Sequence, residues 1–147
     1  MTQEERDRAA RADTELSKYR GAMLEIAACQ RQITRLRALS VSIGAPAPDA
    51  APVAHSGHSD RVADAAIAIA DAEGELALRV SSAMALRRKI MHEIGTVADE
   101  HDRRMMEMRY IECASWWQIA CELGYSDASN ARRRGLRVLA GMGIGNE

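Results

Sequence analysis

The pattern that most constrains this chain is an apolar residue at every seventh position between residues 62 and 97. The positions of this heptad repeat are Val62, Ile69, Leu76, Ala83, Ile90 and Val97, and the offsets of four are filled by Ala66, Val80 and Ile94. Such spacing keeps apolar side chains on one face of an α-helix, and a long helix of this kind needs a partner helix to cover that face. The segment therefore predicts a long helix packed against another helix.

A second amphipathic helix is predicted over residues 3–39. Its apolar stripe consists of Leu16, Tyr19, Met23, Ile26, Ile33 and Leu36. Residues 41–58 lie between the two helices and contain Pro46, Pro48 and Pro52, which prevent a continuous helix. The simplest topology is a coiled-coil-like antiparallel helical hairpin over residues 1–95 with its loop at 41–58.

The seam of this hairpin could close within one chain or between two chains, and the heptad pattern fits both arrangements. We expect a homodimer, because an extended helical hairpin buries little surface by itself. The residues expected at the contact with a second chain are Val62, Ile69, Leu76 and Ile90.

Composition favours an all-α fold. Aromatic residues make up only 3% of the chain, Phe is absent, and no alternating strand-like pattern is found. The longest apolar run, residues 65–70, is too short to span a membrane. We therefore expect an all-α protein that does not insert into a membrane.

A third helix is predicted over residues 97–111. Gly95 is typical of a helix end, and Thr96 with Asp99 would form a capping box for the next helix. Three methionines on this helix are interpreted as gap-filling core residues rather than as a binding surface: Met105, Met106 and Met108. The hinge would begin a second domain over residues 96–140, followed by a flexible tail over 141–147.

Two short helices are predicted within residues 109–139. Ser115 can cap the first, whose apolar face is Trp116, Ile119, Ala120 and Leu123. Gly124 would end it, and Ser126 would cap a second helix over residues 127–139. Two helices joined by a short glycine-containing turn are typical of a helix-turn-helix.

The second of these helices is basic, although the whole chain has a net charge of −1. Arginine can pair in bidentate fashion with guanine and asparagine with adenine in the major groove. The predicted DNA contacts are Ser126, Asp127, Ser129, Asn130, Arg132, Arg133, Arg134 and Arg137. The alternative is an ordinary pair of helices with a solvated basic face.

The residues of this segment resemble region 4 of bacterial sigma factors. The resemblance rests on Arg109-Tyr110-Ile111-Glu112, Ser115-Trp116, Ile119-Ala120 and Glu122-Leu123-Gly124-Tyr125-Ser126. It is closest to a phage and prophage version that has an N-terminal helical region and lies near the ArpU-like and RinA-like late-gene transcriptional regulators. Residues 56–65 are also similar to the segment that joins the two N-terminal helices of that family. The resemblance implies binding to promoter or packaging-gene DNA, or action beside RNA polymerase.

Three positions depart from the family pattern. Trp117 stands where a polar residue is usual, Cys113 replaces a loop glycine, and Asn130 occupies an expected apolar position. If Asn130 does not pack, the inner face of its helix must consist of Ala128, Ala131, Gly135 and Val138. Trp117 lies off the apolar face of its helix, so it would contact the N-terminal helices, a dimer mate or a partner protein.

Metal, cofactor and catalytic sites are not predicted. His55 and His58 have no second pair of ligands at a zinc spacing, and no glycine-rich phosphate loop follows a strand. The three cysteines, Cys29, Cys113 and Cys121, form no CxxC motif and no secretory signal is evident, which favours reduced thiols in the cytoplasm of a bacterial host. Cys113 and Cys121 are expected to be small buried residues. The chain is not expected to be an enzyme.

The sequence thus predicts a sequence-specific DNA-binding transcriptional regulator, phage or prophage encoded, that docks its second short helix in the major groove of double-stranded DNA as a dimer. The alternative is a structural or interaction protein. A packaging adaptor or an RNA-polymerase-binding factor would use the helix-turn-helix for protein contacts instead.

Overall fold

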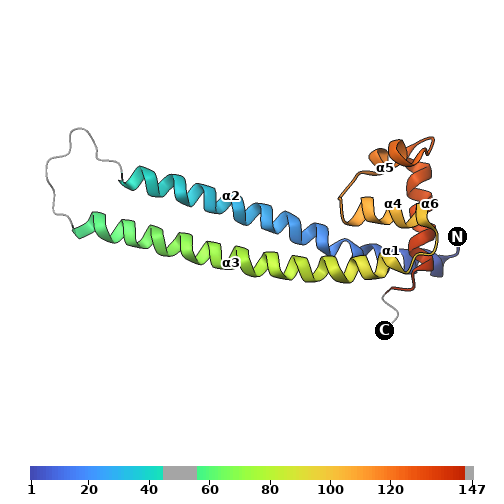
Figure 1. The fold of residues 1–147 in the computed structure, drawn as a ribbon, viewed down its shortest axis with the longest axis horizontal. Coiled ribbons are helices and arrows are strands. Elements are labelled where there is room, and N and C mark those ends of the chain that lie inside the picture. Colours follow the sequence, from blue (N-terminus) through green and yellow to red (C-terminus); the bar gives the residue numbers. More distant parts are fainter. Residues whose placement is uncertain (45–55, 145–147) are drawn as a thin grey trace. The chain divides into compact units, whose positions relative to one another are not determined.

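The computed structural model describes residues 1–44 and 56–144, and its regular elements are all helices (Figure 1). The bounds are α1 Gln3–Leu16, α2 Lys18–Gly44, α3 Ser56–Gly95, α4 Glu100–Tyr110, α5 Trp116–Leu123 and α6 Ala128–Gly141. No strand occurs in the described ranges, so the all-α prediction is confirmed. None of the helices in these ranges has a stretch long and apolar enough to cross a membrane.

The predicted first helix, residues 3–39, is divided in the structure. It is interrupted at Ser17, whose N–H donates to the Asp13 carbonyl at 2.9 Å, and it continues as α2 to Gly44. The end of this helix was therefore predicted five residues too early. Residues 45–55 of the predicted loop lie outside the described residues, and its last three, 56–58, belong to α3.

The helix boundary at Gly95 is confirmed, but the next cap is not formed by Thr96. The Thr96 hydroxyl donates to the Glu93 carbonyl at 2.6 Å, at the end of α3. Asp99 is the N-cap of α4 instead, and its carboxylate accepts the Asp102 N–H at 2.8 Å. Because a carboxylate at the N-cap satisfies a free backbone N–H, α4 begins at Glu100, three residues later than predicted.

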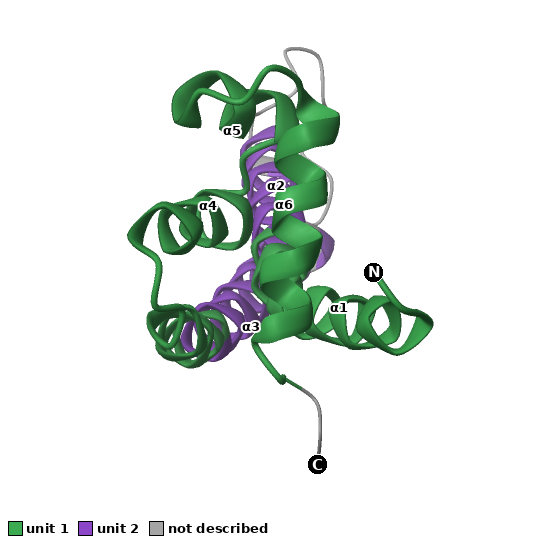
Figure 2. Cartoon of the chain, turned by 90° about the vertical axis from the view of Figure 1, so that its right-hand side faces the viewer, with its two compact units in different colours: residues 1–23, 83–147 green, residues 24–82 purple. Residues whose placement is uncertain are grey.

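The chain forms two compact units (Figure 2). Unit 1 consists of Met1–Met23 and Ala83–Glu147, and unit 2 of Leu24–Ser82. This division differs from the predicted boundary at residue 95, because α1 packs against α6. The N-terminal helix thus belongs with the C-terminal helices rather than with the predicted hairpin region.

Unit 1 has a continuous apolar core. Its largest fully buried side chains are Leu16, Ile94, Met105, Met106, Met108, Ile119 and Leu139. The prediction that the methionines of α4 fill the core is confirmed by their burial. A polar group also lies in this core: Tyr110 of α4 is buried, and its hydroxyl donates to the Asp13 carboxylate of α1 at 2.5 Å.

In unit 2, the α2 and α3 segments run antiparallel. Arg79 of α3 forms an ion pair with Glu25 of α2 at 2.5 Å, and Arg37 of α2 forms another with Glu73 of α3. The buried side chains of α2 in this unit are Ile26, Cys29 and Ile33.

The predicted contacts with a second chain must be revised. Ile90 is buried in the core of unit 1, and Ile69 and Leu76 are already half-buried in unit 2. Val62 retains 42% of its surface. The heptad seam is thus covered within the chain at Ile90, and only Val62 of the predicted set remains largely open.

Candidate nucleic-acid interface

Helix α5 is held at both ends as its sequence predicts. Ser115 is the N-cap, its hydroxyl accepts the Gln118 N–H at 3.2 Å, and the Gln118 side chain accepts the Ser115 N–H at 2.8 Å. At the other end Gly124 adopts a left-handed backbone with φ 77°, a conformation that costs glycine little. The predicted start and end of this helix are confirmed.

Helix α6 begins one residue later than predicted. Its N-cap is Asp127, whose carboxylate accepts the Asn130 N–H at 2.7 Å, so the predicted cap at Ser126 is wrong. The helix extends to Gly141, two residues beyond the predicted end. Asp127 supplies negative charge at the positive end of the helix dipole, which stabilises this start.

The inner face of α6 contains small residues that allow a close approach to α5. Ala131 and Gly135 are buried, and Ala128 and Val138 are half-buried. A side chain at Gly135 would bring its Cβ within 2.4 Å of the Trp116 ring. Trp116 therefore requires glycine at this position, and the predicted inner face is consistent with the observed burial.

Asn130 takes part in a polar network at the start of α6 rather than in the core. Its Nδ2 donates to Ser126 Oγ at 2.6 Å and to Asp127 Oδ2 at 3.3 Å, and its Oδ1 accepts from Arg133 Nη1 at 3.2 Å. These bonds explain how a polar residue replaces the expected apolar one. Ser126, Asp127 and Asn130, all predicted to contact DNA, bond to one another and thereby stabilise the helix start.

Arg134 is also engaged within the protein. Its Nε and Nη2 donate to the two carboxylate oxygens of Asp102 on α4, at 2.8 and 2.6 Å. Asp102 is only 6% exposed, and its hydrogen bonds and charge raise the pKa of Arg134. This bidentate pair joins α6 to α4, so Arg134 acts as an anchor of the helix.

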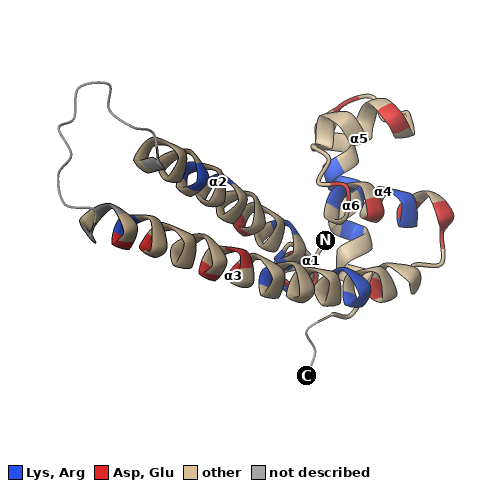
Figure 3. Cartoon of the chain, turned by 60° about the vertical axis from the view of Figure 1, so that its left-hand side comes forward, with Lys and Arg blue, Asp and Glu red and all other residues tan. Residues whose placement is uncertain are grey.

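Besides Arg134, which is exposed but paired with Asp102, four of the predicted DNA contacts lie exposed on α6: Ser129, Arg132, Arg133 and Arg137. Ser129, Arg133 and Arg137 are four residues apart, so they form one row along the helix. Helix α6 contains no acidic residue, as the blue bands along it in Figure 3 show. The exposed row is therefore a local basic surface on a protein whose net charge is −1.

One arginine pairs with three acidic side chains of α4, α5 and the segment between them. Arg104 of α4 pairs with Glu112, with Glu122 at 3.1 Å and with Glu107 at 3.9 Å. The hydrogen bonds to Glu112 and Glu122 raise the pKa of Arg104. This network joins α4 to α5.

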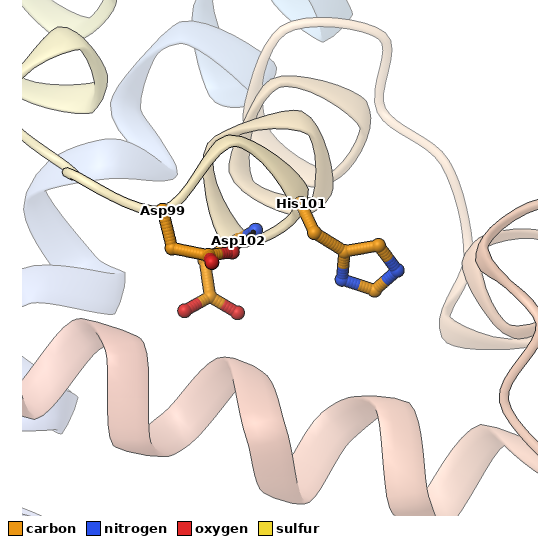
Figure 4. Close-up of side chains that lie close together, drawn as sticks. All are labelled: Asp99, His101 and Asp102. Carbon is orange, nitrogen blue, oxygen red and sulfur yellow. Dashed lines mark hydrogen bonds between the residues drawn. The ribbon is translucent and has the colours of Figure 1, made fainter.

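Asp99, His101 and Asp102 lie close together at the start of α4 (Figure 4), with potential metal-ligand atoms within 4.8 Å of one another. Each of them is engaged elsewhere: Asp99 caps α4, and the Asp102 carboxylate is directed toward α6 and Arg134. His101 Nε2 lies 3.2 Å from the Leu123 carbonyl. The cluster is explained as a clamp between helices.

His55 and the His58 side chain, which were weighed as ligands from the sequence, lie outside the described residues.

The other two positions singled out from the sequence are Trp117 and Cys113. Trp117 is 67% exposed, whereas its neighbour Trp116 is half-buried with the Arg109 guanidinium 5.0 Å from its ring centroid. Cys113 has φ 58°, a left-handed conformation that costs glycine less than cysteine. Cys121 is exposed, so the prediction that it is buried is wrong, and Cys113 is half-buried.

No family model matches this chain, and neither do any curated proteins or solved structures. The functional argument therefore rests on the residues and their geometry.

Proposed function

We propose that the protein is a sequence-specific DNA-binding transcriptional regulator, phage or prophage encoded, that acts in the cytoplasm of its bacterial host. The observation that carries this proposal is the exposed row Ser129, Arg133 and Arg137 on α6, a helix anchored on both α4 and α5. An α-helix fits the major groove, where arginine side chains distinguish guanine from the other bases.

The internal contacts of α6 divide the predicted DNA-contacting residues into two groups. Ser129, Arg133 and Arg137 would face base edges, and Arg132, on the side of the row, would meet a phosphate. The other four, Ser126, Asp127, Asn130 and Arg134, would hold the helix in position, because their side chains bond within the protein. A rigid reading helix reduces the entropy lost on binding.

A salt titration with labelled duplex DNA tests the proposal. The variant R132A/R133A/R137A should lose specific binding, because two base contacts are removed, and its plot of log affinity against log salt should be shallower by about 0.9, because one phosphate contact is removed. The matched control is R31A/R35A/R88A, which removes the same charge from exposed positions outside α6. If both triple variants bind as the wild type does, or if both lose binding equally, α6 is not the reading helix.

Trp117 supports a second candidate function, a structural or interaction protein such as an RNA-polymerase-binding factor or a packaging adaptor. A tryptophan that is 67% exposed is the kind of side chain that anchors protein interfaces. Binding of purified bacterial RNA polymerase should then weaken in W117A but not in R132A/R133A/R137A. DNA binding that requires the arginines but not Trp117 would favour the regulator.

A further inference from the structure

Arg133 is the arginine of the exposed row whose side chain is held by another residue of α6. Its Nη1 donates to Asn130 Oδ1 at 3.2 Å, across one turn of the helix. A guanidinium has further N–H groups, and its edge formed by Nε and Nη2 remains free for a ligand. Arg134 presents the same edge to the two carboxylate oxygens of Asp102. The neighbouring arginine thus shows the two-point contact that the free edge of Arg133 can make with a pair of acceptors.

Asn130 is itself fixed by the residues at the start of α6. Its Nδ2 donates to Ser126 Oγ at 2.6 Å and to Asp127 Oδ2 at 3.3 Å, and its backbone N–H donates to the same Asp127 carboxylate. An asparagine that reads adenine must donate through its amide nitrogen and accept through its amide oxygen at once. Both atoms of Asn130 are already engaged within the protein. Asn130 is therefore suited to positioning Arg133 rather than to contacting a base.

Arg137 lies one turn beyond Arg133 in the same exposed row. Four residues advance about 6 Å along a helix axis. Where a helix reads the major groove, side chains three or four residues apart contact successive bases, chiefly of one strand. Guanine presents O6 and N7 there as a pair of acceptors, and arginine is their bidentate partner. The spacing of the two arginines therefore matches two guanines at adjacent positions of one strand.

We infer that α6 reads two adjacent guanines of one DNA strand, one through Arg137 and one through Arg133, and that Asn130 positions Arg133 for this contact. The inference rests on the proposed function and adds to it the bases that the target must contain. Ser129 occupies the remaining place in the row, and serine has no single preferred base, so the third position should be read with little preference. Because Arg133 is held before DNA binds, it loses less rotamer freedom on binding, and its guanine should be read more strictly than that of Arg137.

Selection by the full chain from a library of DNA duplexes with a random central segment tests the base preference. The bound duplexes should be enriched in two adjacent guanines, and replacing either guanine by another base should weaken binding about 5- to 150-fold. R133A and R137A should each lose the preference at a different one of the two positions. R132A is the matched control, because loss of a phosphate contact should weaken all sequences alike and preserve both guanines.

The variant N130A tests the positioning role. It should reduce discrimination at the Arg133 guanine about 2- to 10-fold, the effect of one hydrogen bond, and leave discrimination at the Arg137 guanine unchanged. S126A is its control, since this change removes the hydroxyl that accepts from Asn130 but leaves the bond between Asn130 and Arg133. S126A should therefore keep both guanines, which separates the contact to Arg133 from a general loosening of the helix start.

The outcomes distinguish this inference from the proposed function. Enrichment of a sequence without adjacent guanines would overturn the inference and leave the proposed function intact. A selection without any enrichment, with all duplexes bound alike or none bound, would overturn both. Unchanged discrimination in N130A, or an equal loss at both guanines, would overturn the assignment of Asn130 as the residue that positions Arg133.

Discussion

At the scale of single residues, neighbouring arginines of α6 have different roles. Arg134 donates two hydrogen bonds to Asp102 of α4, whereas the exposed Arg133 donates one to Asn130 of its own helix. The sequence presents them as equivalent members of one basic run. The two arginines differ because α4 places Asp102 within reach of Arg134, which leaves Arg133 as the one proposed to contact DNA.

Replacing Arg134 by alanine should therefore destabilise the protein by about 2 to 3 kcal/mol, because the buried Asp102 carboxylate loses its partner. Urea unfolding followed by circular dichroism measures the change. R133A serves as the control and should change the free energy of unfolding by less than about 0.5 kcal/mol. Equal effects of the two substitutions would contradict the anchoring role of Arg134.

The Tyr110 hydroxyl should also contribute to stability, and its contribution should depend on pH. Burial and, secondly, the hydrogen bond to Asp13 raise the pKa of Tyr110 above its ordinary value of 10.0. Since the folded-state pKa is the higher one, the stabilisation is present below pH 10 and is lost as the pH rises above it. Y110F should unfold with a free energy lower by about 1.5 to 3 kcal/mol at neutral pH.

The alkaline loss of stability should be smaller in Y110F than in the wild type, as measured by urea unfolding at a series of pH values. Y19F is the comparison, because Tyr19 is half-buried and its hydroxyl has no hydrogen bond within the described ranges. A wild type whose stability is unchanged well above pH 10 would rule out this coupling.

Two helical glycines should respond in opposite directions to alanine. G135A should destabilise by about 1 to 3 kcal/mol, because the added methyl group would meet the Trp116 ring. G74A has open space around it and should stabilise the helix by about 0.5 to 1 kcal/mol. Thermal unfolding of both variants checks this contrast, and a stabilised G135A would mean that Trp116 does not pack on α6.

At the scale of elements, α1 is a structural part of the C-terminal unit. Ala9, Ala12 and Leu16 face the core that also contains Leu139 of α6. The predicted division at residue 95 did not include the contact between α1 and α6. The amphipathic pattern of residues 3–39 shows that one side of the helix is apolar, but it does not show which helix packs against that side. The interruption at Ser17 separates α1 from α2, whose remaining length extends into unit 2.

L16A should therefore destabilise the C-terminal helices, by about 2 to 5 kcal/mol, although it lies near the N-terminus. Chemical unfolding followed by the fluorescence of the tryptophans, both in unit 1, measures the effect. L39A is the control, since Leu39 is 60% exposed and should contribute little. An L16A variant as stable as L39A would show that α1 does not support the core.

At the scale of the whole molecule, the two units should differ in stability. Unit 1 buries a continuous core, whereas unit 2 is a thin helix pair, so amide hydrogens of unit 2 should exchange faster at low protein concentration. Hydrogen exchange with mass spectrometry measures the difference, and equal protection of the two units under dilute conditions would contradict this view.

The sequence by itself determined the helical class, the ends of α5 and the stop at Gly95. These features depend on local chemistry: a capping hydroxyl at Ser115, a left-handed glycine at Gly124, and apolar residues at helical spacing. Such signals act within one or two turns of helix, so they can be read without knowing what the helix packs against.

The tertiary structure alone decided which polar side chains remain free. Asp102 accepts from Arg134, Asp13 from Tyr110 and Ser126 from Asn130, and none of these pairs is predicted from the sequence. The first two pairs join residues far apart in the chain. It also decided that α1 joins α6 rather than the helices that follow it. Long-range partners depend on how helices pack in space, and an amphipathic pattern specifies that a face must be covered without specifying by what.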